Sequence, residues 1–354
     1  MRHRKVELFT RVMVCVIVGL LLGFLFPRAV FKEEQTISFL ELPELLRDAL
    51  SQILPSAYVD DADIPLTPVE ETLIFADRDV SEADLSFERK VVISIHDYED
   101  AISIIEEIPH GEMGIQTIGT FVISDETLDS LQQLIIQLKG RYGQYGFLLL
   151  DLETGAGLYY NIDEEFYCAS CIKAINLSAI CYYYPEALSR YYTYMRSAIV
   201  NSNNECYAMI SRAYPASIRN DWRHRAHLGD QTNGTIFQYL TIRELAQLWC
   251  VTWDYLNQEG EGPDTMREWL TDTYQSCFAA QLGVRDGYEI HSKAGWTFGY
   301  DLTSSEGGYV ISPGGTYLLV VMTNRSGSPL VNLASLVPAL DRVYQEYAPQ
   351  KAIH

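Results

Sequence analysis

A serine and a lysine lie three positions apart in the segment CASCIKA, residues 168–174. Residues at this spacing share one face of a helix, so the amine of Lys173 can reach the hydroxyl of Ser170. A serine hydroxyl is a weak nucleophile and needs a base. A desolvated lysine near a second positive charge has a pKa close to neutrality and can accept the proton. The pair is therefore a candidate for nucleophilic catalysis.

Two cysteines, Cys168 and Cys171, flank this serine and allow a different interpretation of the segment. A CxxC pair can be a redox motif, but the βαβ context of thioredoxin-like proteins is missing. The two cysteines could instead pack in the core beside the helix or form a structural disulfide. A serine followed three positions later by a lysine is also expected by chance about once in a chain of this size. The pair therefore needs support from further motifs.

Two further motifs follow in the chain. The segment NSNNECY places Ser202 and Asn204 at the head of an expected helix, where both residue types are also favoured as N-caps. The segment HSKAGW places Lys293, Ala294 and Gly295 on an expected strand. Glycine there permits close approach of another chain or a ligand, and a lysine on an edge strand also opposes aggregation. Each motif alone has a structural explanation.

Taken in order, Ser-x-x-Lys, Ser-x-Asn and Lys-x-Gly resemble the active-site set of the penicillin-recognising serine enzymes, the class A β-lactamases and D,D-peptidases. The resemblance covers about residues 124–347, and residues 151–173 are similar to the family's strand, turn, strand and nucleophile helix. It implies a serine hydrolase that is acylated by a β-lactam or by a D-alanyl peptide of the cell wall.

The resemblance also implies roles for the first two motifs. Ser170 is the acylated nucleophile, and Lys173 is its base. Ser202 is the hydroxyl that relays a proton to the leaving nitrogen. Asn204 binds the amide side chain of the substrate.

The third motif is implied to bind and polarise the substrate. Lys293 attracts the substrate carboxylate and lowers the pKa of its neighbours, and Gly295 lets the substrate lie along the strand. The backbone N–H group of Ser170, with that of Trp296 or Thr297, forms the oxyanion hole.

Two departures from the family concern the cleft. Ala294 stands where the family has threonine or serine, so carboxylate recognition is weaker or uses Thr297. The interval from Ser170 to Ser202 is short for a class A enzyme, which implies a trimmed helical stretch and a more open cleft.

A third departure concerns the second half of the reaction. Class A enzymes activate the deacylating water with a glutamate in an ExxxN pattern, and residues 207–288 contain no such pattern. Asp221 and Glu205 are the nearby acids, and neither is a strong substitute. Without a positioned base the acyl-enzyme turns over slowly, which favours cell-wall peptide chemistry. The alternative is a weak or inactive pseudoenzyme that binds cell-wall peptide as a sensor or scaffold.

The elements around the motifs predict an α/β fold of the α+β kind, like that of β-lactamases and transpeptidases. Residues 124–140 predict a helix that begins at a serine cap and ends at glycine. Two strands joined by a turn at residues 153–155 and a helix from about residue 170 to 184 follow. A helix-rich block to residue 270, three strands and a final helix complete the pattern. We expect an antiparallel sheet flanked by helices, with an all-helical subdomain whose junction with the sheet holds the site.

The N-terminus predicts a membrane anchor. Residues 1–11 are basic, and residues 12–26 are uncharged and end before Pro27. The run is short for a full span, but no small-x-small cleavage site follows it, so we favour an uncleaved signal anchor over residues 12–31. The positive-inside rule then makes residues 1–11 a cytoplasmic tail of a single-pass protein of the cell membrane. Residues 32–120 are an acidic stalk or small accessory region, and residues 121–350 are the extracytoplasmic hydrolase domain.

The amino-acid composition limits the classes of binding partner that we expect for this protein. The apolar fraction of 48% and the charged fraction of 21% are those of a globular protein. The net charge of -21 opposes phosphate backbones, so we expect no nucleic-acid partner. His224 and His227 could bind a metal, but the arginines of their loop oppose a cation, and we expect no metal or cofactor. The six cysteines beyond residue 15 allow fifteen complete pairings, among which the sequence does not choose.

Overall fold

The computed structural model describes residues 97–140, 143–231, 234–298 and 301–353. These residues belong to one compact unit of the chain, which begins at Glu88. The expected cytoplasmic tail, the anchor and most of the stalk region therefore lie outside the described residues. Among the helices that are described, none is long and apolar enough to cross a membrane.

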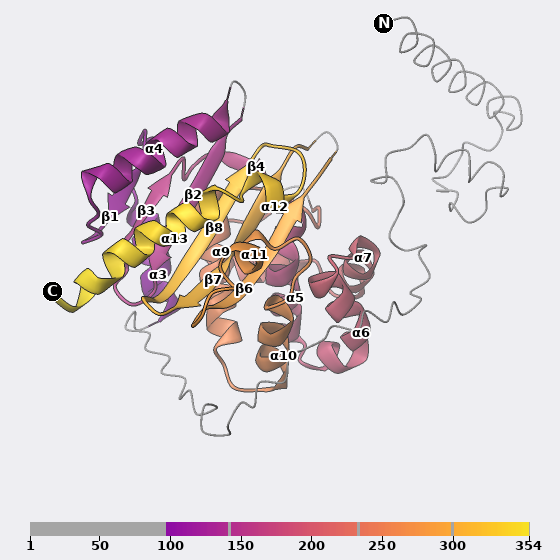
Figure 1. The fold of residues 1–354 in the computed structure, drawn as a ribbon. Helices are drawn as coiled ribbons and strands as arrows, with labels where there is room; N and C mark the ends of the chain where they lie inside the picture. The colour runs from indigo at the N-terminus through magenta and orange to yellow at the C-terminus, as the bar shows by residue number, and fades with distance from the viewer. Residues whose placement is uncertain (1–96, 141–142, 232–233, 299–300, 354) are drawn as a thin grey trace, which may run out of the picture. The chain divides into compact units, whose positions relative to one another are not determined.

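Within the described residues, six strands form an antiparallel sheet with the order β1-β3-β2-β8-β7-β6 (Figure 1). Every pair of neighbouring strands in it is antiparallel, as the sequence predicted. β6 is an edge strand, and it carries the Lys-x-Gly motif. The strands span β1 Gln116–Ile118, β2 Tyr145–Asp151, β3 Gly157–Tyr160, β6 Glu289–Trp296, β7 Ser304–Ser312 and β8 Gly315–Thr323.

Both faces of the sheet are covered by helices, so its central strands are apolar on both sides. In β2, Phe147 and Leu149 point to one core, and Leu148 and Leu150 point to the other, as the alternation of a strand requires. The helices α4 and α13 pack on the first face, and α3, α5 and α9 pack on the second (Figure 1). The expected layers are thus confirmed.

The helical block lies between the two halves of the sheet in the chain. It includes the short paired strands β4 and β5; β4 comes just before the nucleophile motif, and β5 comes directly before α9. The bounds of the helices and of these two strands, including the helices before and after the block, are α3 Tyr98–Glu107, α4 Asp125–Lys139, β4 Glu165–Tyr167, η6 Ala169–Cys171, α5 Ile172–Tyr183, α6 Glu186–Val200, α7 Asn204–Ala213, α8 Ser217–Arg225, β5 Tyr239–Thr241, α9 Ile242–Leu256, α10 Glu261–Leu270, α11 Cys277–Gln281, α12 Pro329–Asn332, α13 Leu336–Tyr347 and η7 Ala348–Ile353.

The final helix differs from the prediction, because it is divided into α12 and α13. Pro338 explains the break. A proline in the interior of a helix lacks the N–H group that would bond to the carbonyl four residues earlier, but it is tolerated in the first turn. The new helix begins at Leu336 and so places Pro338 in its first turn.

The compact unit begins ahead of the expected domain boundary at residue 121. Ile102 and Ile105 of α3 are buried in the core. The guanidinium of Arg243 donates to the carbonyl of Ile108 at 3.0 Å and pairs with Asp163 at 2.7 Å, which fastens the end of α3 to the domain. β1 also pairs with β3. Residues 97–120 are therefore part of this domain.

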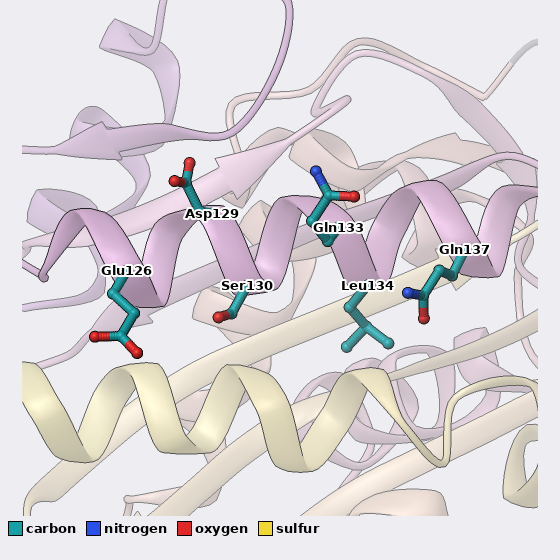
Figure 2. A pocket seen from close by; sticks show the side chains of 6 residues that line it. All are labelled: Glu126, Asp129, Ser130, Gln133, Leu134 and Gln137. Carbon is teal, nitrogen blue, oxygen red and sulfur yellow. The ribbon is translucent and has the colours of Figure 1, made fainter.

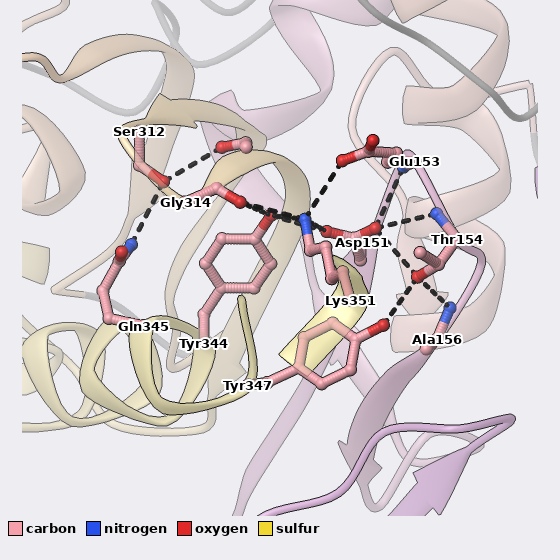
Figure 3. Close-up of polar contacts among 11 residues, drawn as sticks. Asp151, Glu153, Thr154, Ala156, Ser312, Gly314, Tyr344, Gln345, Tyr347 and Lys351 are labelled. Atoms are coloured by element: carbon pink, nitrogen blue, oxygen red, sulfur yellow. Dashed lines mark hydrogen bonds and ion pairs between the residues drawn. The ribbon is translucent and has the colours of Figure 1, made fainter. Parts of the chain in front are cut away.

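A buried polar network holds the last helical turn against the β2–β3 turn (Figure 3). Asp151 is fully buried and accepts hydrogen bonds from the Thr154 backbone at 2.8 Å and the Tyr344 hydroxyl at 2.5 Å. It also forms an ion pair with Lys351, which donates to the carbonyl of Gly314 at 3.0 Å. The carboxylate of Asp151 therefore joins the middle of the sheet to η7.

Replacement of Asp151 by alanine should lower the free energy of unfolding by about 3 kcal/mol, because it removes the fully buried carboxylate from its ion pair with Lys351 and leaves only the more exposed Glu153, at 3.5 Å, beside that amine. The measurement is urea denaturation followed by circular dichroism. Asp129→Ala, on the exposed face of α4, is the matched control and should leave the midpoint unchanged. Equal midpoints for the two variants would contradict this account of the network.

Candidate active site

The first motif lies in a tight turn at the start of a core helix. Ser170 is part of η6 and is 9% exposed, directly before α5. The first ten residues of α5 are buried, so the helix holds the serine rigidly. Ala169 has a φ of 45°, which is uncommon for a residue other than glycine and turns the chain sharply at the serine.

Gly295 brings β6 into direct contact with this turn. A Cβ atom at Gly295 would lie 2.4 Å from the carbonyl oxygen of Cys168 and 2.8 Å from the backbone nitrogen of Ser170. No side chain fits in that space, so only glycine allows the edge strand to approach so closely. The close approach predicted from the sequence is thus made by the chain's own nucleophile turn.

Two buried lysine amines meet at Ser202. Lys173 is fully buried, and its Nζ donates to Asn204 Oδ1 at 2.7 Å, to the Ser202 carbonyl and to Ser202 Oγ at 3.5 Å. Lys293 is also fully buried, and its Nζ donates to Ser202 Oγ at 3.2 Å and to the Ala294 carbonyl at 2.9 Å. The structure therefore brings residues of all three motifs together.

Burial changes the charge of these amines. Loss of water and, as a smaller contribution, the positive charge of Lys293 together lower the pKa of Lys173 to about 6. Burial also lowers the pKa of Lys293, to about 8. Near pH 7 Lys173 is therefore mostly a neutral amine that can accept a proton, whereas Lys293 is mostly a cation.

The cap of α7 explains how Ser202 and Asn204 can face Lys173. The N-cap is Asn203, whose side chain accepts a hydrogen bond from the Cys206 backbone at 2.9 Å. Ser202 has a φ of 60°, and this left-handed conformation turns the chain just before the helix. The sequence allowed Ser202 or Asn204 to be the cap, but the residue between them takes that role.

The register of β6 decides which backbone N–H groups face the site. The N–H group of Thr297 donates to the Thr303 carbonyl at 3.2 Å, on the β7 side. Alternate residues of an antiparallel strand point to opposite neighbours, so the N–H group of Trp296 points to the open edge. The carbonyls of Ser292 and Ala294 face the same edge, where side-chain donors bind them.

Two described side chains, Lys293 and Cys206, shift the pKa of Lys173 through their charge. Neither of them is a carboxylate. The two acids considered from the sequence, Asp221 and Glu205, are both exposed. Aromatic rings flank the amine instead. The ring of Tyr207 is centred 5.6 Å from Lys173 Nζ, and the ring of Phe237 is centred 5.9 Å from it. The sequence analysis missed both, because neither belongs to a motif.

The cysteines around Ser170 are core residues. All six described cysteines are unpaired thiols, and Cys168 and Cys171 are fully buried in the main core. Burial raises the pKa of the Cys168 thiol to about 12 and also raises that of Cys171, so both are protonated and weakly reactive. Of the three roles that the sequence left open for this pair, the structure shows helix packing.

Other polar features lie outside this site. His224 pairs with Asp230 at 2.7 Å, and His227 pairs with Glu106 at 3.2 Å. The described part of the chain holds no group of three side chains suited to a metal ion. A shallow hollow on α4 contains none of the motif residues (Figure 2); it is lined by Glu126, Asp129, Ser130, Gln133, Leu134 and Gln137.

The candidate site thus contains a serine and two lysines, and it lies where the antiparallel sheet meets the helical block. Solved structures with a similar fold include an ancestral class A β-lactamase, with 18% identity over 61% of this chain and 99% of that chain and a TM-score of 0.46. A mutant class A β-lactamase of the last common ancestor of Gram-negative bacteria has 16% identity over the same shares and a TM-score of 0.48. PBP-A has 20% identity over 61% of this chain and 97% of its own, with a TM-score of 0.46.

No protein-family model matches the sequence, and no curated protein matches it. The similarity to the solved structures concerns the fold, and the roles of individual residues rest on the geometry described above.

Replacement of Gly295 by alanine should separate β6 from the nucleophile turn, because backbone atoms of both must move to admit the methyl group. We expect a loss of about 1–3 kcal/mol in the free energy of unfolding. Gly229→Ala is the control, since a Cβ atom there meets nothing within 4 Å. Chemical denaturation of both variants is the measurement, and equal stability would contradict the close contact.

Proposed function

We propose that this protein is a serine hydrolase of the β-lactamase-like group in which Ser170 forms an acyl-enzyme with a β-lactam or a D-alanyl peptide. The observation that carries the proposal is the position of Ser202 Oγ between two buried amines, that of Lys173, which is three residues after Ser170, and that of Lys293. The anchor at residues 12–31 and the location of the domain outside the cytoplasm are part of the proposal and rest on the sequence.

In the acylation step, the neutral amine of Lys173 accepts the proton of Ser170. The Ser170 oxygen forms a bond to the carbonyl carbon of the substrate, and the carbon–nitrogen bond then breaks. The hydroxyl of Ser202 passes its proton to the leaving nitrogen and takes up in its place the proton that Lys173 accepted from Ser170, which returns Lys173 to the neutral amine. Lys293 keeps this hydroxyl polarised. Lys173 now contacts Ser202 and Asn204, and catalytic hydrogen bonds often form only in the complex with substrate.

Two backbone N–H groups are available for the oxyanion. Gly295 packs β6 against the nitrogen of Ser170, and the next residue, Trp296, points its N–H group to the same open edge. Thr297 uses its N–H group inside the sheet. The proposed oxyanion hole therefore consists of the backbone N–H groups of Ser170 and Trp296, and the bond from the Thr297 N–H group to Thr303 favours Trp296 over Thr297 in this role.

The second half of the reaction lacks a carboxylate base beside Lys173 in the described part of the chain. Hydrolysis of an acyl-serine ester needs a water molecule that is activated close to the ester. Among the described residues that shift the pKa of Lys173 there is no carboxylate, and Ala294 offers no hydroxyl beside Lys293. We therefore propose slow deacylation, which suits cell-wall peptide chemistry better than rapid β-lactam hydrolysis.

Incubation with a fluorescent penicillin should label the protein covalently, and mass spectrometry of the digested protein should locate the label on Ser170. Ser170→Ala should remove the labelling, whereas Ser189→Ala, on an exposed position of α6, should retain it. Absence of labelling at high penicillin concentration would overturn the acyl-enzyme proposal.

The second candidate is a pseudoenzyme that binds cell-wall peptide as a sensor or scaffold. The buried Ala294 beside Lys293 and the lack of a carboxylate beside Lys173 favour it. It requires peptide binding by the parent protein and by Ser170→Ala alike, together with no labelling of either. The labelling experiment therefore separates the two candidates.

The rate of acylation should have a bell-shaped dependence on pH. It should rise as pH increases through about 6, where Lys173 loses its proton, and fall through about 8, where Lys293 loses its charge. Stopped-flow measurement of acylation between pH 5 and pH 10 tests this. In Lys293→Arg the cation persists, so the fall near pH 8 should disappear. A rate that does not rise between pH 5 and pH 7 would contradict the role of Lys173 as the base.

A further inference from the structure

The segment 236–238 is fastened beside the nucleophile turn. The Cys168 backbone donates to the Gln238 carbonyl at 2.9 Å, only two residues before Ser170. The Tyr207 hydroxyl donates to the Ile236 carbonyl at 2.9 Å. These two bonds hold both ends of the segment, so the position of the residue between them is fixed with respect to the site.

That residue is Phe237, whose side chain is half-buried. Its ring is centred 5.9 Å from Lys173 Nζ and 5.3 Å from the ring of Tyr207. The hydrogen bonds of the amine go to Ser202 and Asn204. Aromatic rings and hydrogen-bond acceptors thus share the surroundings of Lys173.

Hydrolysis of an acylated Ser170 has definite requirements. The oxygen of a water molecule forms a bond to the carbonyl carbon of the ester, and the bond from that carbon to Ser170 Oγ breaks. One proton leaves the water and one proton returns to Ser170 Oγ, so a proton acceptor must lie close to both. Lys173 is one helical turn from the serine and is such a group, provided that a water molecule can reach the space beside its amine. A phenyl ring beside it can neither accept the proton nor hold the water by a hydrogen bond.

We propose that Phe237 keeps the hydrolytic water away from the acylated Ser170 and thereby sets the lifetime of the acyl-enzyme. This inference rests on the proposed function, because it requires that Ser170 is acylated. Acylation needs no water, whereas deacylation does. One apolar side chain can therefore slow the second step and leave the first step unaffected. Phe237 occupies space beside Lys173 and takes no part in bond making or breaking, so it is a positioning residue.

The experiment follows the loss of fluorescent penicillin from Ser170 after free label is removed. In the series Phe237→Leu, Phe237→Val and Phe237→Ala, the lifetime of the acyl-enzyme should fall as the side chain becomes smaller. Phe237→Glu adds a carboxylate and should shorten the lifetime at least about tenfold, since a general base contributes that much or more. Tyr192→Ala removes an exposed ring that packs on Trp269 of α10, and it should keep the parent lifetime.

The effect of added formate on the rate of deacylation distinguishes the loss of the Phe237 ring from a general loss of structural stability. In Phe237→Ala the space left by the ring can admit formate as an external base, so added formate should accelerate deacylation with saturation. The parent protein should show little response. Thermal unfolding identifies variants that do not fold, and Phe237→Leu and Phe237→Val, which keep the segment apolar, then decide the question.

The outcomes separate the two levels of the proposal. Labelled protein with the same lifetime in the parent and in all folded Phe237 variants overturns the role of Phe237 and leaves the proposed function in place. An equal formate effect in the parent and in Phe237→Ala also overturns that role. Absence of labelling in the parent and in every variant overturns the proposed function, and this inference with it.

Discussion

The site depends on the contact between the edge strand β6 and the turn that carries Ser170. The backbone of Gly295 occupies the space beside Ser170, and a single methyl group would not fit there. Lys293, two residues earlier on the same strand, donates to Ser202 Oγ, and the backbone nitrogen of Ser170 lies against the strand next to Trp296. Glycine alone allows this contact, because the nucleophile turn occupies the space in which any other residue would carry its Cβ atom.

Burial then sets the chemistry of the groups that this contact brings together. No described carboxylate lies close to Lys173, so a charge on both buried amines at once has a large free-energy cost. Lys173 is therefore mostly neutral near pH 7, while Lys293 remains mostly charged. The same apolar surroundings that make Lys173 a base for the proposed first step provide, among the described residues, no carboxylate for the proposed second step. Phe237 and Tyr207 belong to those surroundings, which links the proposed acylation to the proposed stability of its product.

Much of the fold could be predicted from local patterns. Alternating apolar residues and glycine turns indicated the strands, and a serine cap with helical spacing indicated α4, because these signals depend on neighbours in the chain. The packing of α3 could not be predicted in this way, because it depends on Arg243, more than a hundred residues later. The division of the last helix has a local cause in Pro338, which the sequence analysis did not weigh.

The sequence by itself determined the chemical groups of the candidate site. Ser170 and Lys173 are three residues apart on one helical face, and such spacing can be found in the chain without knowledge of the fold. Only the tertiary structure decided which groups meet them. The register of β6 against β7 turns the N–H group of Trp296, and not that of Thr297, to the open edge, and hydrogen bonds to distant segments bring Phe237 beside Lys173. These arrangements are contacts between residues far apart in the chain, so no local pattern records them.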